Sequence, residues 1–428
     1  MSSKGAYPEM VPCDEPEASH KIQHDGSGWW ALFWITLAEL FAMSVWFSAS
    51  AVAGALTRHW HLSGTAVTWL TAAVQLGFVG GALISATLGV ADRFPPRMLM
   101  GWGAMGAAIT TVALLGVSHG GWVPFALRAM TGACLAVVYP VAVQWVTRWF
   151  PRHRGLAVGI LIGGLTIGSA LPHLLSGMPL LQHWQDVLAG SAGLAVVSWG
   201  LVLWVVPEYP GPFHPPKFQW DRVGAVLRDR PVMWANLGYW GHMWELYAMW
   251  TWLPAFFLAS WVTYFQGTAL NGMAGGVGFA AIGLAGFAGA LAGGWAADRW
   301  GRTRATIGAM GISGAMALLI GATYRQAPWL TIVVAVVWGF SVIADSAQFS
   351  AAVTELSTRE LQGSALTLQM AVGFLLTIGS IDLVGLLKPI VGWSHVFMVL
   401  AAGPAVGIWA MTRLRQRPES AKLANGRR

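Results

Sequence analysis

Five of the ionisable residues that lie inside long apolar stretches are candidates for a functional site. They are Glu39, Arg128, His242, Glu245 and Asp345. A charged side chain within a hydrocarbon layer costs about 3 kcal/mol or more unless it is paired or hydrated, so such residues usually serve a function. Burial raises the pKa of a carboxyl group, and a nearby cation lowers it again. These residue types therefore predict a buried site that binds protons or a charged solute.

The spacing of these residues along the sequence indicates which of their neighbours share a helix face with them. Glu39 and Glu245 are each followed by a methionine at i+4 and a tryptophan at i+7, on the same helix face. The residues expected to line a shared cavity in this way are Met43, Trp46, Met249 and Trp252. His242 lies one turn before Glu245, so the two groups are expected to titrate as a coupled pair.

Each candidate residue also has a structural alternative. Glu39 and Glu245 could hydrogen-bond to neighbouring helices, and Asp345 could do the same within its polar stretch. Arg128 could support the structure or couple conformations instead of contacting a solute. His242 and Glu245 offer two metal ligands, but a zinc site needs at least three from the protein. We expect no metal, no cofactor and no enzymatic activity.

The composition of the chain is that of a membrane protein. Of its 428 residues, 56% are hydrophobic and 10% are charged, and the mean hydropathy is +0.57. A soluble domain carries about a quarter charged residues. The net charge of +7 could suggest a nucleic-acid partner. No soluble basic domain exists to bind one, so the expected surroundings are the lipid bilayer.

Apolar runs of about 20 residues, the length that crosses the hydrocarbon core, recur along the chain. The predicted spans are 29–55, 65–89, 98–117, 122–147, 155–175, 187–206, 232–258, 273–297, 305–323, 329–352, 364–386 and 392–412. The sequence thus predicts an all-α integral membrane protein with twelve transmembrane helices in two six-helix bundles. The predicted divisions are a disordered cytoplasmic tail (1–28), an N-terminal bundle (29–206), a cytoplasmic linker (207–231), a C-terminal bundle (232–412) and a basic cytoplasmic tail (413–428).

The positions of the basic residues predict the orientation of the chain. Lysine and arginine collect in cytoplasmic loops. If both termini are cytoplasmic, only Arg58, Arg325 and Lys388 fall in outer loops, and Arg128 lies within a span. The other basic residues then lie in the tails, the inner loops and the linker. The sequence predicts cytoplasmic N- and C-termini.

Two short segments occur twice in the sequence, once in each predicted bundle. Glu39–Trp46 resembles Glu245–Trp252, and Ala91–Arg93 resembles Ala297–Arg299. Both pairs are separated by the same number of residues, which indicates an internal duplication. Parallel repeats of this kind are a known transporter architecture, in which the solute binds near the membrane midplane between the repeats.

Several motifs resemble those of the major facilitator superfamily. Gly294–Arg304 is similar to the signature loop of that family between helices 8 and 9, and Gly89–Arg97 to its copy between helices 2 and 3. Arg128–Gly132 and Gly155–Gly159 resemble the motifs of helices 4 and 5. The signature loop implies a conformational latch, in which acids bind helix N-termini or arginines of the neighbouring helix pair. Its expected members are Asp92, Arg93, Arg97, Gly294, Asp298, Arg299, Gly301 and Arg302.

The resemblance also implies a function. Helices 1, 4, 7 and 10 line the central cavity in this family, and each of those predicted helices carries one of the five ionisable residues. The leading hypothesis is a proton-coupled carrier of a small solute that works by alternating access, as a monomer in the plasma membrane, or in the inner membrane of a Gram-negative source.

Two other functions remain open. The first is a proton antiporter that exports cationic or amphipathic compounds. Three acids against one arginine favour a cation, whereas Leu171 stands before Pro172 in the place of the glycine of antiporter motifs, which disfavours export. The second is a membrane sensor or assembly protein that kept the fold without transport.

Overall fold

The computed structural model describes residues 27–150, 154–181, 183–209 and 218–427. Most of the predicted tail 1–28 and the middle of the predicted linker 207–231 lie outside the described residues. Within them every regular element is a helix. The first group of α-helices is α2 (Ser27–Met43), α3 (Ser48–Ala51), α4 (Ala53–Trp60), α5 (Gly64–Thr87), α6 (Val90–Arg93), α7 (Pro96–Ala113), α8 (Val123–Leu135), α9 (Tyr139–Trp149), α10 (Arg154–Gly177) and α11 (Trp184–Trp204).

A second group of helices follows the linker. It comprises α12 (Trp220–Arg228), α13 (Arg230–Trp261), α14 (Gly267–Gly278), α15 (Ala285–Trp300), α16 (Arg302–Leu319), α17 (Pro328–Ala344), α18 (Ser346–Leu356), α19 (Arg359–Val391) and α20 (Ala402–Arg415). Short 3-10 helices are η1 (Leu114–Gly116), η3 (Ile320–Thr323), η4 (Val396–Ala401) and η5 (Pro418–Gly426), and η2 (Phe279–Leu284) is a π-helical turn.

The helices confirm a multi-pass membrane protein. Over the described ranges, ten helical segments are long and apolar enough to cross a membrane. Two other segments fall outside that group: α2 is apolar but has only 17 residues, and α13, with 32 residues, is interrupted by polar and aromatic side chains. The count of twelve crossings therefore stays a prediction.

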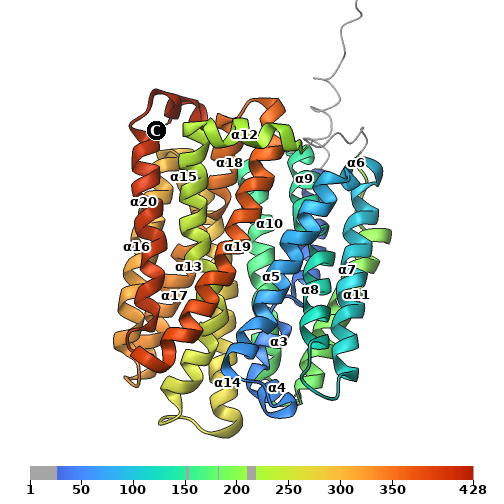
Figure 1. Cartoon of the computed structure of the whole chain (residues 1–428), viewed down its shortest axis with the longest axis vertical. Coiled ribbons are helices and arrows are strands. Elements are labelled where there is room, and N and C mark those ends of the chain that lie inside the picture. The colour runs from blue at the N-terminus through green and yellow to red at the C-terminus, as the bar shows by residue number, and fades with distance from the viewer. Residues whose placement is uncertain (1–26, 151–153, 182, 210–217, 428) are drawn as a thin grey trace, which may run out of the picture.

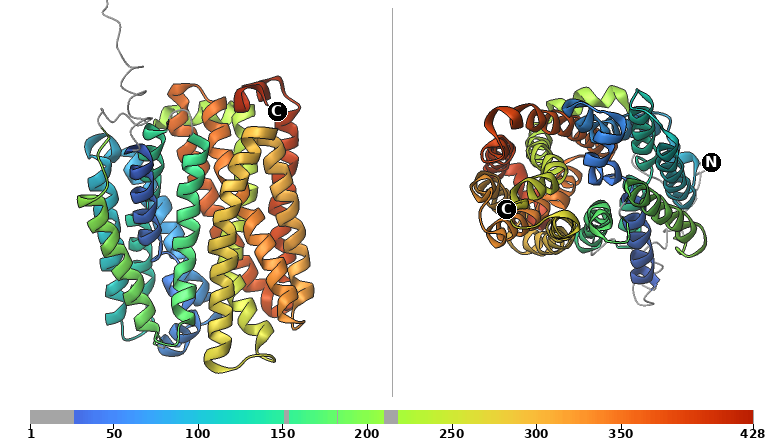
Figure 2. Two further views of the ribbon diagram at one scale, coloured as in Figure 1. Left: turned by 180° about the vertical axis from the view of Figure 1, so that it is seen from behind. Right: turned by 90° about the horizontal axis from the view of Figure 1, so that it is seen from below.

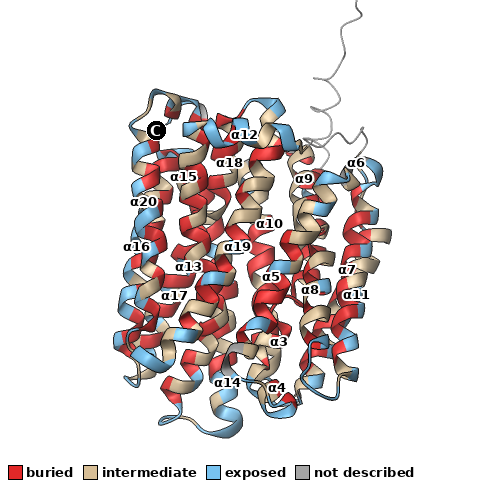
Figure 3. Ribbon diagram, in the orientation of Figure 1, coloured by how far each residue is buried: buried red, intermediate tan, exposed pale blue. Residues whose placement is uncertain are grey.

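The long helices run side by side along the longest axis of the molecule (Figure 1). Helices α2–α11 form one group and α13–α20 the other, and the view along the helices separates the two (Figure 2). The groups meet where α5 packs on α19 and where α10 packs on α14 and α15. We call the end that carries α12 and the C-terminus the α12 end, and the opposite one the α4 end. Buried residues line the facing sides of the helices, and exposed ones cover their outer surfaces and the two ends (Figure 3).

Three of the predicted spans are broken helices. The first is interrupted between α2 and α3, at residues 44–47. The fourth is interrupted between α8 and α9, just before Pro140, whose ring removes a backbone donor. The tenth is interrupted at Asp345, between α17 and α18. Such breaks free backbone groups inside the bundle, and nearby polar side chains must satisfy them.

Glycine allows the closest helix contacts. A Cβ atom added at Gly77 of α5 would meet the backbone carbonyl of Ala129 in α8, and one added at Gly293 of α15 would meet that of Ala344 in α17. Small residues at crossings let the backbones of membrane helices approach closely. These contacts set the helix positions that bring the ionisable residues together.

Two elements lie in the predicted linker and the predicted C-terminal tail. The predicted linker contains the amphipathic helix α12, which packs on α19 and buries Val226. The predicted C-terminal tail contains the last turn of α20 and the short helix η5, which packs on α18. Both elements lie at the α12 end and add to its surface (Figure 1).

Candidate functional site

A polar cluster lies inside the second helix group. Nδ1 of His242 in α13 is 2.8 Å from Oδ1 of Asp345, at the break between α17 and α18. One turn along α13, Glu245 accepts a hydrogen bond from the Ser313 hydroxyl at 2.8 Å and another from the Trp338 indole N–H at 2.7 Å. All five side chains are buried. We call them the carboxylate cluster.

The partner of His242 differs from the expected one. The spacing along the helix pairs His242 with Glu245, whereas the structure pairs it with Asp345 from a different helix. Glu245 lies one turn further along α13, so the three buried ionisable groups are close to one another. Among the described residues no atom lies within hydrogen-bonding distance of Nε2 of His242. The carboxylate cluster thus contains a buried nitrogen atom, Nε2 of His242, without a hydrogen-bond partner among the described residues.

Glu39 lies in the first helix group and is fully buried. Neither of its carboxylate oxygens has a hydrogen-bond partner among the described residues. A buried polar group without a partner requires a water, an ion, a ligand or a proton. Among the acids that the structure describes, Glu39 is the one with both carboxylate oxygens buried and without a hydrogen-bond partner.

Arg128 of α8 is fully buried and donates three hydrogen bonds to backbone carbonyls. Its Nε donates to Leu70 at 3.2 Å, its Nη1 to Val45 at 3.0 Å, and its Nη2 to Trp46. The carbonyls of Val45 and Trp46 lie at the break between α2 and α3, and the Val45 carbonyl also accepts from the Ser48 hydroxyl at 2.9 Å. The geometry agrees with the structural alternative for Arg128, in which its side chain supports the fold instead of contacting a solute.

The four predicted lining residues are all buried. Exposed fractions are 1% for Met43, 2% for Trp46, 0% for Met249 and 9% for Trp252, so none of them faces an open cavity in this conformation. The indole N–H of Trp252 donates to the carbonyl of Ile381 at 3.0 Å, and Lys388 lies over its ring.

Trp46 belongs to a group of rings that joins the two helix groups. It lies 5.2 Å from Phe78, 5.7 Å from Tyr247 and 5.7 Å from Phe374, measured between ring centroids. Further ring contacts extend the group, and we call it the aromatic cluster: Trp46, Phe47, Phe78, His173, Tyr247, Trp250 and Phe374. Its rings come from α5, α10, α13, α19 and the break between α2 and α3.

Glu39 and Glu245 are not brought together. Glu245 bonds to α16 and α17 of its own group, and Glu39 packs in a helix that contacts α9, α10 and α11. No contact between the two acids occurs over the described part of the chain. Their shared access to one aqueous cavity remains a prediction for another conformation.

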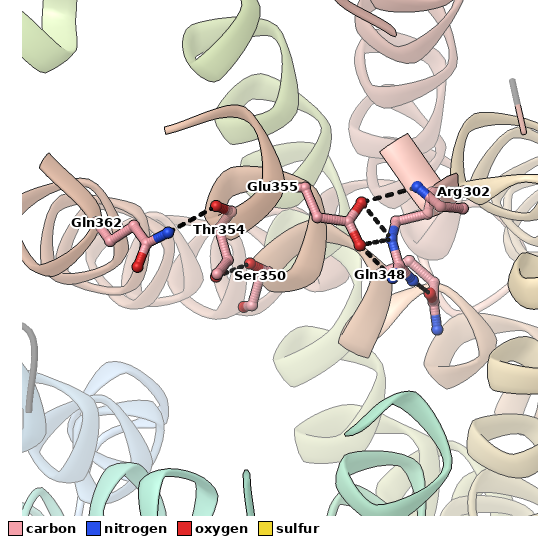
Figure 4. Close-up of polar contacts among 7 residues, drawn as sticks. Arg302, Gln348, Ser350, Thr354, Glu355 and Gln362 are labelled. Carbon is pink, nitrogen blue, oxygen red and sulfur yellow. Dashed lines mark hydrogen bonds and ion pairs between the residues drawn. The ribbon is translucent and has the colours of Figure 1, made fainter. Parts of the chain in front are cut away.

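The signature loop of the second group lies at the α12 end. Gly301 ends α15 with φ of 92°, a backbone conformation that favours glycine, and α16 starts at Arg302. Arg302 binds Glu355 with Nε at 2.8 and 3.0 Å from the two carboxylate oxygens, and its Nη1 donates to Gln348 at 2.7 Å (Figure 4). The loop is thereby fixed to α18.

Asp298 of the same loop faces the first helix group. A Cβ atom added at Gly155, at the start of α10, would lie 3.5 Å from Oδ2 of Asp298 and 3.6 Å from Oδ1. The Asp298 side chain is exposed, as is that of Arg299, which lies over the ring of Trp295. Gly294 is buried close to the carbonyl of Gly155. This is the position that a carboxylate needs to interact with a helix N-terminus.

The first copy of the loop has other contacts. Arg97 donates to the carbonyl of Val206 at 2.5 Å and pairs with Glu208 at 3.2 Å, so it binds the end of α11 within its own group. Arg93 is exposed. The side chain of Asp92 lies outside the described residues.

Sequence reasoning missed several of these residues. Glu355 binds Arg302, and Asp382 accepts a hydrogen bond from Thr68 at 2.8 Å across the α5–α19 contact. No local pattern marks Glu355, whereas Asp382 is an ionisable residue within the predicted span 364–386. His173 is ionisable and lies within a predicted span, so the criterion that selected Glu39 would also have selected it.

Comparison with known proteins agrees with this architecture. The model of the Major Facilitator Superfamily matches residues 35–379. The uncharacterized MFS-type transporter Rv1250 of Mycobacterium tuberculosis is 27% identical over 46% of this chain and 33% of its own length. The gallate transporter of Pseudomonas putida is 26% identical over 37% of this chain and 35% of its own length. The puromycin resistance protein pur8 of Streptomyces alboniger is 28% identical over 41% and 35%.

Each of these matches spans about a third of the relative's length. A crystal structure of the nucleoside transporter NupG has the same fold, with a TM-score of 0.65 and 14% identity over 90% of this chain and 99% of that one. The fold and the long apolar helices define a multi-pass membrane protein. The chain belongs to the Major Facilitator Superfamily.

Proposed function

We propose that the protein is a proton-coupled secondary transporter that moves a small solute by alternating access. The observation that carries this proposal is the carboxylate cluster, in which two acids and a histidine are buried together beside a helix break. Ionisable groups buried in this way are the usual elements of proton relays in membrane proteins.

The hydrogen bonds of Glu245 suit a proton-binding group. Ser313 and Trp338 both donate to it, and these bonds stabilise the ionised carboxylate, whereas burial favours the protonated one. A conformational change that moved α16 or α17 away from α13 would remove donors and favour proton uptake. Proton binding and helix movement are then linked, as transport requires.

The contacts between the two helix groups suit alternating access. At the α12 end, Asp298 faces the start of α10, and across the α5–α19 contact Thr68 donates to Asp382. Between these contacts the aromatic cluster separates the two ends. Opening either end requires only one set of contacts to break, so the two openings can alternate.

We further propose the arrangement in the membrane. Two bundles, 29–206 and 232–412, cross it twelve times and are joined by the linker 207–231. The α12 end is cytoplasmic, together with the tails 1–28 and 413–428, because most basic residues gather there. The protein acts as a monomer in the plasma membrane.

A second candidate function is a proton antiporter that exports cationic or amphipathic compounds. Its support is that Arg128 is occupied by three carbonyls, whereas Glu39 is buried without a hydrogen-bond partner. An interior with free acids and an occupied arginine favours a cation. The relatives differ on this point, since one is named a puromycin resistance protein and others a gallate transporter and an oxalate:formate antiporter.

The test begins with a thermal-shift screen of the purified protein against small anions, amino acids, organic acids and cationic compounds, since a bound ligand raises apparent stability. Compounds that stabilise the protein are then tested in proteoliposomes with an imposed pH gradient. Proton coupling predicts accumulation that follows the gradient and collapses when a protonophore is added. Transport that ignores the gradient contradicts the proposal.

A further inference from the structure

The C-terminal segment Pro418–Gly426 is docked on the α12 end of the molecule. Leu423 is fully buried and Ala424 is 7% exposed, and Leu423 shares one hydrophobic core with residues of α18 and α20. The Ser420 side chain is also buried, and its hydroxyl donates to the carbonyl of Arg417 at 2.7 Å. The segment is thus held by apolar burial in addition to its polar contacts.

The segment bonds directly to the ion pair at the start of α16. The backbone N–H of Ala424 donates to Oε2 of Glu355 at 3.0 Å. The same carboxylate binds Arg302, whose Nε lies 2.8 Å from Oε2 (Figure 4). Ala424 adopts a positive φ of 46°, which an alanine rarely does, and this conformation accompanies the bond to Glu355. Glu355 is therefore held from two sides.

A second contact reaches the other end of the same loop. The guanidinium of Arg427 donates to the backbone carbonyl of Asp298. The C-terminal segment and the residues after it thus contact Asp298 directly and Arg302 through Glu355. Both residues flank the turn between α15 and α16. On its opposite side this turn presents the Asp298 carboxylate to the start of α10.

We propose that the C-terminal segment 418–427 is a clamp that sets the closure of the α12 end. By holding Glu355 on Arg302 and the Asp298 carbonyl in place, it fixes the turn that carries the Asp298 carboxylate against α10. Undocking of the clamp loosens this turn and lets the two helix groups separate at the α12 end. The inference extends the proposed transport function by adding regulation of one of its two openings.

The clamp is tested by a buried-charge variant with a matched exposed control. Leu423→Asp places a carboxylate in the buried contact, whereas Ala421→Asp adds the same residue at an exposed position of the same segment. Spin labels on Phe94→Cys and Thr358→Cys, two exposed positions on different helix groups at the α12 end, report the separation of the groups. The background carries Cys13→Ser and Cys134→Ala, which remove the two native cysteines.

Double electron–electron resonance in nanodiscs is expected to show a population with longer label separations in Leu423→Asp. The Ala421→Asp distribution should match that of the parent protein. A chain that ends at Arg417, which leaves α20 whole, should behave as Leu423→Asp does, and it serves where Leu423→Asp folds poorly. Distributions that are the same in all four proteins overturn the clamp. This measurement needs no transport, so a failure of proton coupling leaves its result readable.

The rate of solute exchange provides a second readout. In proteoliposomes with equal pH on both sides, Leu423→Asp is expected to change the maximal exchange rate and to leave the ligand affinity from thermal shifts unchanged. The clamp acts on a conformational step, whereas general loss of structure would weaken binding as well. A variant that loses affinity and rate in parallel contradicts the clamp.

Discussion

Nδ1 of His242 lies 2.8 Å from Oδ1 of Asp345, and this contact joins the middle of α13 to the break between α17 and α18. Both side chains are buried, with exposed fractions of 1% and 2%. The contact therefore joins α13, which carries the second copy of the repeated Glu-Leu-aromatic-Ala-Met segment, to the span that is interrupted at Asp345. Any proton that binds here changes the attraction between two helices.

Loss of Asp345 is predicted to destabilise the protein. Removing one partner of a buried polar pair leaves the other group without its partner, which costs about 1–3 kcal/mol. Asp345→Asn should lower the unfolding temperature in detergent clearly, whereas Asp221→Asn, on the exposed side of α12, should not. In the double variant His242→Gln with Asp345→Asn the loss should be smaller than the sum of the single losses. Additive losses would mean that the two residues do not interact.

Glu245→Gln is predicted to separate exchange from accumulation. Glutamine cannot lose a proton, but its carbonyl oxygen can still accept from the Trp338 N–H, and its NH2 group can donate to the Ser313 hydroxyl oxygen, so the local structure should survive. In proteoliposomes the variant should exchange solute across the membrane and fail to accumulate it in response to a pH gradient. If it accumulates solute as the wild type does, the proton site lies elsewhere, and Glu39 or Asp345 takes the role.

Asp298→Asn is predicted to slow transport with little effect on ligand affinity. The carboxylate faces the start of α10, and its charge is what a helix N-terminus attracts, with a contribution of about 0.3–1 kcal/mol at an exposed site. Replacing it therefore changes the conformational equilibrium at the α12 end rather than the buried site. The maximal rate and the thermal shift with ligand are measured together. An unchanged rate would exclude the latch.

Arg128→Lys is predicted to impair folding rather than solute selectivity. The guanidinium satisfies three buried carbonyls, and an ammonium group lacks the planar fork that reaches all of them. Each carbonyl left without a donor costs about 1–3 kcal/mol. Size-exclusion profiles and unfolding temperatures should show the loss in the absence of any solute. A folded, stable Arg128→Lys protein with altered solute preference would instead assign Arg128 to the binding site.

Two glycines of α5 provide a test of the helix packing. Gly77→Ala should destabilise the protein, because the new methyl group meets the backbone of Ala129, and overpacking of this kind costs about 1–3 kcal/mol or more. Gly80→Ala meets no atom within 4 Å and should be neutral or stabilising, since alanine favours helices over glycine by about 1 kcal/mol. Equal unfolding temperatures of the two variants would contradict the close contact of α5 with α8.

The sequence alone determined the class of the protein. Apolar runs and the bias of basic residues follow from the solvent in which a helix must lie, and both are visible in the sequence. The two repeated segments are visible there as well. The predicted spans cover each described helix that is long and apolar enough to cross a membrane. The sequence also selected Glu39, Arg128, His242, Glu245 and Asp345, all of which are buried.

Only the tertiary structure decided how these residues are paired. His242 binds Asp345 rather than its neighbour Glu245, Arg128 binds the carbonyls of a broken helix, and Arg302 binds Glu355 and, through it, the C-terminal segment. The partners are far apart along the chain. Their contacts depend on the rotation and depth of each helix, which close packing at small residues such as Gly77 and Gly293 fixes. Hydropathy records that a helix is buried but not which neighbour each of its faces meets.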